Sequence, residues 1–403
     1  MRCRVCDSEK LELAIDLGYQ PWCNNFLRKE ELGKEPFYPL RVVYCLRCST
    51  AQLDYTVPKE VMFTQHTYLS GVTKSLNDHF RRVAEEADMF FFSNLKNKSV
   101  LDIGSNDGTQ LKHYQKLGYE VMGVESSKDI AEIANAAGIY TVNEFFNLDF
   151  ARRLGKKFNL INAAGVFFHL EELHSVAEGI RDALDENGIF LAQFLYMKSI
   201  IDNCAFDQIY HEHLLYYNLK TINFLLNLHG LCMFDAYLAP IHGGSVIGFI
   251  THSQRRQPTT RRLETMLEKE QKEKSSELST YLDFAQRISR MKEENIIYLD
   301  AAKQREKRIF GFGAPAKGNT LLNYFKIGAR YIDYLVEKNE LRRGLYSPGM
   351  HIPIVIEKEL REIPDIYYVL AWNYKDEILS NNQQLTNKGV EFYFPINPKE
   401  ITV

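Results

Sequence analysis

Two pairs of cysteines near the amino terminus constrain this chain more than any other feature. Cys3 and Cys6 form one C-x-x-C pair, and Cys45 and Cys48 form the other. Each pair presents two thiols on one tight turn, and two such turns complete a tetrahedral zinc site of four thiolates. We therefore predict zinc rather than unligated or redox-active cysteines. Because four thiolates leave no open position for a substrate, the ion should be structural, and nothing requires Cys23 as a further ligand.

Length and composition indicate an ordinary globular protein with several domains. With 403 residues the chain is long for one hydrophobic core, so two or three domains are expected. Its net charge of −3 gives no reason to expect nucleic acid or a membrane as a partner. No apolar run reaches the roughly 18–20 residues of a membrane span, and the first residues resemble no secretory signal, so we expect a cytoplasmic location.

The pattern after the cysteine region is an alternation of helices and strands. The first ~60 residues favour short strands and turns, and apolar residues three and four apart then predict a helix over 75–95. Buried strands separated by helical segments are expected at 99–104, 119–127, 158–168 and 188–196. Such alternation is typical of the α/β class with a doubly wound, largely parallel sheet.

A charged segment separates this pattern from a second one of the same kind. Residues 255–308 favour helix and mix acidic with basic side chains, which predicts solvated helices between domains rather than a basic partner-binding arm. Another strand, glycine turn and helix follow. We therefore expect four segments, with the bounds 1–65, 66–254, 255–308 and 309–403.

The stretch "VLDIGSNDGTQL", residues 100–111, predicts a ligand-binding turn. A strand leads into Gly104, and Gly108 precedes a helix, so the backbone can approach a ligand closely. Glu125 ends the next strand, where a carboxylate can accept hydrogen bonds from both hydroxyls of a ribose. A dinucleotide fingerprint would have glycine at position 106, which is Asn106 here. The form D-x-G-x-x-x-G resembles the turn of S-adenosylmethionine methyltransferases, so this donor is favoured over NAD or a merely structural turn.

Two further glycine motifs are less specific. In "GFGAPAKGN", residues 311–319, backbone amides and Lys317 would suit a phosphate, although a tight turn explains the motif as well. In "IHGGSVIG", residues 241–248, His242 and Ser245 lie around two flexible glycines and could line a pocket, and a turn between strands is an equal alternative.

The run "FDQIYHEHLLYY", residues 206–217, crowds proton-handling side chains together. On a strand His211 and His213 would point the same way, which allows a metal pair, but no third ligand is evident nearby. A buried polar network and a general base supported by tyrosines are the alternatives. A methyl donor gives a reason for a base, because a substrate proton must leave before or during methyl transfer. Spacing alone leaves the two histidines equivalent.

These motifs, in this order along nearly the whole chain, resemble a known family. It comprises the sugar C-methyltransferases that act on nucleotide-linked keto-deoxysugars in antibiotic and surface-polysaccharide pathways. The resemblance implies a zinc module, a central Rossmann-like methyltransferase domain and a C-terminal Rossmann-like domain that contributes to nucleotide-sugar binding. It also implies a monomer with a nucleotide diphosphate keto-sugar as substrate, S-adenosylmethionine as donor and no nucleic acid partner.

The resemblance also implies roles for individual residues. His213 would be the base that removes the proton beside the sugar ketone, with Tyr210 and Glu212 assisting and with Tyr68 and His169 at the sugar. The remaining implied contacts fall on residues of the glycine motifs and their flanking strands. For the donor these are Asp102, Gly104, Ser105, Asn106, Gly108, Glu125, Ser126 and Ala164, and for the substrate His242, Ser245, Gly313, Lys317 and Asn319.

Three positions depart from the family pattern. Gly165 replaces an asparagine, Gln193 a glutamate and Ile247 an arginine, all close to the expected donor and sugar pockets. They leave the sugar, its nucleotide and the methylated carbon open. A zinc-anchored nucleic-acid methyltransferase and a degenerate sugar-binding protein are the alternative functions.

Overall fold

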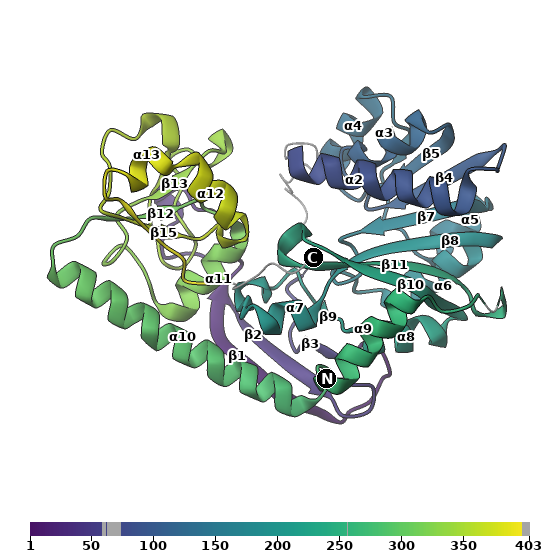
Figure 1. The fold of residues 1–403 in the computed structure, drawn as a ribbon, viewed down its shortest axis with the longest axis horizontal. Coiled ribbons are helices and arrows are strands. Elements are labelled where there is room, and N and C mark those ends of the chain that lie inside the picture. Colours follow the sequence, from purple (N-terminus) through teal and green to yellow (C-terminus); the bar gives the residue numbers. More distant parts are fainter. Residues whose placement is uncertain (59–61, 63–73, 256, 397–403) are drawn as a thin grey trace.

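The computed structural model describes residues 1–58, 62, 74–255 and 257–396, so Tyr68 lies outside the described residues. Two α/β lobes stand side by side, and purple N-terminal strands together with a long helix bridge them from below (Figure 1). The mixed α/β architecture with a cysteine cluster near the amino terminus confirms the fold class predicted from the sequence. The exact domain bounds stay a prediction.

The central lobe is built on a seven-stranded sheet in the order β10-β11-β8-β7-β4-β5-β6. Five of these strands are parallel, while β11 runs antiparallel to both of its neighbours. The strands are β4 (Lys98–Ile103), β5 (Tyr119–Val124), β6 (Thr141–Val142), β7 (Phe158–Ala164), β8 (Leu184–Leu195), β10 (Leu231–Ala239) and β11 (Ser245–His252). The third expected strand ends at Ala164, earlier than predicted, because Gly165 has a left-handed φ of 76°.

Helices cover both faces of this sheet. Strand side chains alternate between faces, so Val100 packs toward α2 and α3 while its neighbour Leu101 packs toward α5 and α6. The helices are α2 (Lys74–Ala87), extended by a wider turn at Asp88–Phe92, α3 (Thr109–Lys116), α4 (Lys128–Ala136), α5 (Leu148–Leu154), α6 (Leu173–Ala183), α7 (Met197–Asp202) and α8 (Leu219–Leu228). Among the described residues, no helix has both the length and the apolar composition that crossing a bilayer requires.

The N-terminal strands form a sheet that the central lobe completes. Its order is β1 (Leu11–Pro21), β2 (Phe37–Cys45), β3 (Ala51–Leu53) and β9 (Leu215–Tyr216), all antiparallel. The strand β9 belongs to the run 206–217, so the cysteine module is paired directly with the segment that carries His211 and His213. The expected short strands include an eleven-residue β1, longer than the sequence pattern indicated.

The C-terminal lobe has a five-stranded parallel sheet in the order β14-β13-β12-β15-β16. Its strands are β12 (Ile309–Phe312), β13 (Leu335–Glu337), β14 (Ile354–Ile356), β15 (Ile366–Val369) and β16 (Glu391–Tyr393), and its helices are α11 (Ala316–Phe325), α12 (Lys375–Asn381) and α13 (Gln383–Thr386). Single 3-10 turns occur along the whole chain, at Lys29–Glu31, Phe206–Gln208, Ile241–Gly243, Ser253–Arg255, Glu340–Arg342, Glu357–Glu359 and Trp372–Tyr374.

The charged segment forms two helices, α9 (Arg261–Lys272) and α10 (Leu278–Gln304), and α10 is not a solvated linker. One of its faces is buried, through Tyr281, Phe284, Ile288, Asn295, Leu299 and Ala302. These positions recur every three, four or seven residues, as a helix needs to bury one stripe. The expectation of a solvated helix was wrong for the buried face of α10. Charged residues on its other face dominate the amino-acid composition of the segment and hide the apolar stripe.

Removing an anchor on the buried stripe of α10 should destabilise the protein. We expect Ile288→Ala to lower the free energy of unfolding by about 2–5 kcal/mol, because it leaves a cavity at a side chain that is 1% exposed. Ile297→Ala on the same helix is the matched control, since Ile297 is 69% exposed and should change stability by less than about 0.5 kcal/mol. Urea unfolding midpoints measure both, and equal effects would contradict the packing described for α10.

Candidate active site and metal centre

The four predicted cysteines converge on one point. Their sulfur atoms all lie within 4.8 Å of one another, with 3.5 Å between the Sγ atoms of Cys3 and Cys48 and also of Cys6 and Cys45. Four thiols this close, three of them buried, fit a tetrahedral zinc ion, which thiolates bind at about 2.3 Å. Among the described residues, no other group of this kind could hold a metal.

The cysteine module is joined directly to the histidine run. The second pair of cysteines leads straight into β3, and the amide of Leu53 donates to the carbonyl of Leu214, one residue after His213 (3.0 Å). Ala51 pairs with Tyr216 in the same ladder. If zinc binding orders the cysteine module, it therefore also helps to fix the backbone next to the histidines.

The donor turn is held by the acidic residue that the sequence singled out. Glu125 lies just beyond β5, and its carboxylate accepts from the amides of Asn106 (3.0 Å) and Ser127 (2.9 Å). Asn106 has a left-handed φ of 50°, which asparagine tolerates better than most residues. The carboxylate therefore lies at the end of the turn and is oriented before any ligand arrives.

Backbone space at the turn is tight. Gly104 has φ of 68°, and a Cβ there would lie 2.7 Å from the Cγ2 atom of Val166. Ser105 is buried, and its hydroxyl has no hydrogen-bond partner within the described part of the chain. Beneath them Asp102 accepts from the side chain of Asn162 at 2.5 Å, and burial raises its pKa to about 7. A glycine that permits close approach of the backbone fits the binding of S-adenosylmethionine at this turn.

The other predicted donor residues lie around the same sheet edge. Gly108 has φ of 74° and begins α3. Ser126 is exposed, and its carbonyl accepts from Asn143 (2.9 Å). Ala164 ends β7, opposite Gln193 of β8. The structure therefore brings these residues to the carboxyl ends of neighbouring parallel strands, where such sheets bind ligands.

His213 has its tautomer fixed by the backbone. Its Nδ1 lies 2.7 Å from the carbonyl oxygen of Gln208, and because a carbonyl only accepts, Nδ1 donates. A neutral ring then carries its lone pair on Nε2. The ring packs against Phe168, with centroids 4.7 Å apart, and against Tyr210 at 3.8 Å.

His169 forms a second histidine of the same kind beside it. Its Nδ1 donates to the carbonyl of Glu212 at 2.5 Å, and its ring centroid lies 5.1 Å from that of His213. The carboxylate of Glu212 accepts from Trp22 (2.8 Å) and Asn24 (3.1 Å) of the N-terminal region. Glu212 therefore orients His169 through its backbone carbonyl and is itself held through its side chain.

One short segment connects the donor turn to the histidine pair. Residues 165–169 follow β7, and the side chain of Val166 packs against Gly104. Two residues later the carbonyl of Phe168 accepts from the amide of Leu214 (2.7 Å), and His169 then stacks near His213. The sulfonium end of the donor and the histidines are thus expected at the same edge of the sheet.

Tyr210 and His211 differ from His213 in their surroundings. Burial of the Tyr210 hydroxyl raises its pKa far above the usual range, so it stays protonated and can donate. His211 is 1% exposed and contacts the ring of Tyr38 edge-on at 5.8 Å. Burial lowers its pKa to about 4, partly offset by the backbone of Tyr38 and Pro39, so the ring stays neutral at physiological pH.

The predicted substrate residues divide into two groups. Ser245 begins β11, and its hydroxyl donates to the carbonyl of Ile241 (3.1 Å), while the side chain of His242 lies outside the described part of the structure. Gly313 forms the second glycine turn with φ of 79°. Lys317 and Asn319 lie at the start of α11, where Asn319 donates to the carbonyl of Cys23 (2.7 Å).

Sequence reasoning missed the residues that hold this site from a distance. Trp22 and Asn24 gave no signal, because nothing local links them to Glu212. His79 of α2 hydrogen-bonds Gln193 (2.7 Å) and is buried at the same edge of the sheet.

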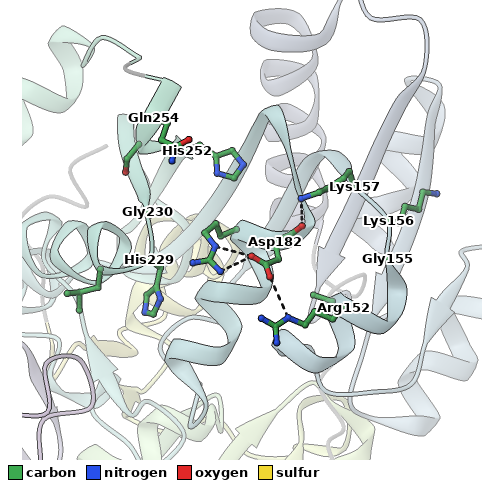
Figure 2. A pocket seen from close by; sticks show the side chains of 13 residues that line it. Arg152, Gly155, Lys156, Lys157, Asp182, His229, Gly230, His252 and Gln254 are labelled. Atoms are coloured by element: carbon green, nitrogen blue, oxygen red, sulfur yellow. Dashed lines mark hydrogen bonds and ion pairs between the residues drawn. The ribbon is translucent and has the colours of Figure 1, made fainter.

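A cavity of about 640 Å³ lies at the other edge of the central sheet, beside the start of β7 and β8 (Figure 2). Asp182 accepts from Arg181 (2.8 Å) and pairs with Arg152 (3.7 Å), and Lys157 bonds the Asp182 carbonyl. These cations lie at the carboxyl ends of α5 and α6, where positive charge stabilises a helix. The cavity contains none of the predicted site residues, and its charges are explained by the helices.

Three family models match successive parts of the chain. A zinc binding domain matches residues 3–63, a methyltransferase domain matches 76–234, and a C-methyltransferase C-terminal domain matches 240–397. Together the three models support a C-methyltransferase with three domains. This C-methyltransferase takes S-adenosylmethionine as methyl donor and zinc as its metal, as the turn and the cysteines predicted.

One curated relative agrees with this assignment, and two solved methyltransferases show a weaker likeness. The C-methyltransferase NovU of Streptomyces niveus is 29% identical over 399 residues, which are 98% of this chain and 95% of NovU. The plantazolicin methyltransferase BpumL, solved with SAH, is 16% identical with a TM-score of 0.36, covering 44% of this chain and 88% of its own. The magnesium protoporphyrin IX methyltransferase ChlM from Synechocystis PCC 6803, with bound SAM, is 12% identical with a TM-score of 0.34, covering 47% and 88%. At such TM-scores the two solved structures support no conclusion about substrate.

The purified C-methyltransferase should contain one zinc ion per chain, and Cys45→Ser should lose it. Removing one of four thiolates opens the site and weakens β3, so the melting temperature should fall by roughly 5–10 °C. Cys232→Ser is the control, because Cys232 lies in β10 outside the cluster. Atomic absorption and scanning calorimetry measure both variants, and full zinc content in Cys45→Ser would refute the ligand set.

Gly104→Ala should weaken the binding of S-adenosylmethionine by at least about tenfold, because the variant combines left-handed strain of ~1–2 kcal/mol with a clash against Val166. Gly138→Ala is the matched control, since its φ of 80° brings the same strain but no atom lies within 4 Å. Titration calorimetry gives both affinities. If the two variants bound the donor equally well, the turn would not be the donor site.

Proposed function

We propose that this C-methyltransferase methylates the carbon beside the ketone of a nucleotide-linked keto-deoxysugar. The observation that carries the proposal is the pair His169 and His213, whose Nδ1 atoms both donate to backbone carbonyls. In each neutral ring the basic nitrogen is then Nε2, and both rings lie next to the segment 165–169 that contacts the donor turn. A base is needed only if a weakly acidic proton must leave, as a proton alpha to a ketone does.

His213 would remove that proton. The carbon–hydrogen bond breaks, the proton moves to Nε2, and the electron pair moves onto the ketone oxygen to form an enolate. The protonated Tyr210 hydroxyl is a suitable donor to that oxygen, because its raised pKa keeps it neutral while it hydrogen-bonds. His169, 5.1 Å away between ring centroids, is placed to hold the sugar or to pass the proton on.

The donor supplies an electrophilic methyl group on a sulfonium centre. The protein aligns this methyl donor. Gly104 lets the backbone approach the donor closely, and the amides of Asn106 and Ser127 already orient the carboxylate of Glu125. The enolate carbon then forms the new bond as the methyl–sulfur bond breaks, leaving a neutral thioether. Since a thioether is a poor nucleophile, the transfer should run in one direction.

The nucleotide part of the substrate is assigned to the C-terminal lobe. The turn at Gly313 follows the first strand of a parallel sheet and precedes α11, and such sheets bind ligands at this end of their strands. The net charge of −3 favours this substrate over nucleic acid. The monomeric state, the cytoplasmic location and the role of Tyr68 stay predictions.

His213→Asn should abolish proton removal. With a thymidine diphosphate-linked 4-keto-6-deoxyglucose carrying tritium beside the ketone, we expect tritium release and kcat to fall by about 10²–10⁴-fold, because the general base is lost. Binding of S-adenosylmethionine, measured by calorimetry, should not change.

His211→Asn is the matched control, since His211 faces Tyr38 and not the site. It should retain tritium release. Near wild-type release in His213→Asn would exclude His213 as the base, and a nucleic acid that shifts in a gel while no nucleotide sugar binds would exclude the sugar substrate.

A further inference from the structure

A buried charge cluster joins the C-terminal lobe to the histidine run. Asp207 lies in the 3-10 turn Phe206–Gln208, is 0% exposed and accepts from the indole N–H of Trp372 (2.7 Å). Its carboxylate also lies 3.7 Å from the Nζ atom of Lys317. Trp372 and Lys317 both belong to the C-terminal lobe, so one central-lobe carboxylate meets two of its side chains.

Lys317 and Trp372 also contact each other. The Nζ atom lies 3.8 Å from the centroid of the Trp372 ring, a close cation–π distance. Within the described residues the ammonium forms no hydrogen bond, and one oxygen of Asp207 likewise has no partner. The three groups therefore depend on one another, since a lone charge at this depth is costly.

The titration behaviour fits a mutually dependent pair. Burial lowers the pKa of Lys317, and the charge of Asp207 opposes that shift. Burial raises the pKa of Asp207, and Lys317 and Trp372 oppose it in turn. Removal of either partner thus leaves the other without compensation.

The cluster lies one residue from the group that fixes the base. The carbonyl of Gln208, next to Asp207, is the acceptor that sets the tautomer of His213 (2.7 Å). On the same side Gly243 abuts the Trp372 ring, where a Cβ would lie at 2.9 Å, and the amide nitrogen of Gln208, at 3.5 Å. Trp372 therefore holds the turn 206–208 through the carboxylate of Asp207, and Gly243 lies close to both the indole ring and the side-chain amide of Gln208.

We propose that Asp207, Lys317 and Trp372 are positioning residues that fix the Gln208 carbonyl and, through it, the tautomer and orientation of His213. In this proposal the C-terminal lobe helps to orient the base, in addition to binding substrate. This inference rests on the proposed function only in naming His213 as the base. The contact of Lys317 with a phosphate, expected from the sequence, is not needed for it.

The test compares Lys317→Met and Asp207→Asn with the double variant that carries both. Each single change leaves one buried charge unpaired, so both singles should lose thermal stability and kcat. The double variant removes both charges and should regain most of the stability. Its kcat should still be at least tenfold below wild type, with unchanged affinity for S-adenosylmethionine, because the ion pair that joins Asp207 to the C-terminal lobe is then lost.

Lys292→Met is the matched control. Lys292 lies on α10 with its Nζ atom 5.0 Å from the ring of Tyr324 in α11, so the variant removes a cation over an aromatic ring without touching Asp207. Its kcat should equal that of the wild type. A double variant that regained both stability and kcat would overturn the proposal, because the pair would then be purely structural.

A second readout needs no substrate. In protein with ¹⁵N-labelled histidine, the His213 signals are identified by their loss in His213→Asn and should show protonated Nδ1 in the wild type and in Lys292→Met. In the double variant we expect a mixture of tautomers. An unchanged His213 spectrum would overturn the proposal, whereas tritium release surviving in His213→Asn would overturn only the base assignment.

Discussion

The pairing of β3 with β9 is the contact on which the rest of the site depends. It is short, yet it joins the cysteine module to the residues just after His213. A segment of about sixty residues buries only about 60% of its surface and is marginally stable alone, and a bound metal can add stability. The zinc ion therefore stabilises more than its own loop, because Cys48 leads into β3 and β3 fixes the backbone of the histidine run.

Hydrogen bonds to backbone carbonyls distinguish His213 from its neighbour His211. His213 and His169 each donate Nδ1 to a carbonyl, so in each neutral ring Nε2 is the basic nitrogen. His211, two positions from His213, has no such carbonyl at hydrogen-bond geometry within the described residues and lies against Tyr38. Spacing alone left the two histidines of the run equivalent, and the long-range packing distinguishes them.

Local patterns predicted the parts of the molecule that local chemistry determines. The cysteine pairs, the strand leading to Gly104 and the acidic residue at 125 need only neighbours in sequence to be recognised. Glu212 could not be interpreted in this way, because its carboxylate meets Trp22, 190 positions earlier in the chain. The buried face of α10 was missed for a related reason, since its packing partners in β1 and α11 are distant in sequence.

The register of the central sheet gives two of the departures from the family pattern a common explanation. Gln193 of β8 lies directly opposite Ile247 of β11, so the glutamate and arginine of the family pattern would face each other across two antiparallel strands. This chain replaces both members of an opposite-charge pair, which keeps the charge balance. His79 supplies the hydrogen bond that Gln193 needs, and Ile247 is buried in the apolar core.

The third departure, Gly165, changes the side chain and is compatible with the same backbone conformation. Gly165 has a left-handed φ of 76°, a conformation that glycine and asparagine adopt most readily, and its nearest contact to an added Cβ would be 3.9 Å away. An asparagine would therefore fit the same turn. Because the three departures leave Gly104, Glu125 and His213 in place, they keep the residues to which we assign proton removal and alignment of the methyl group.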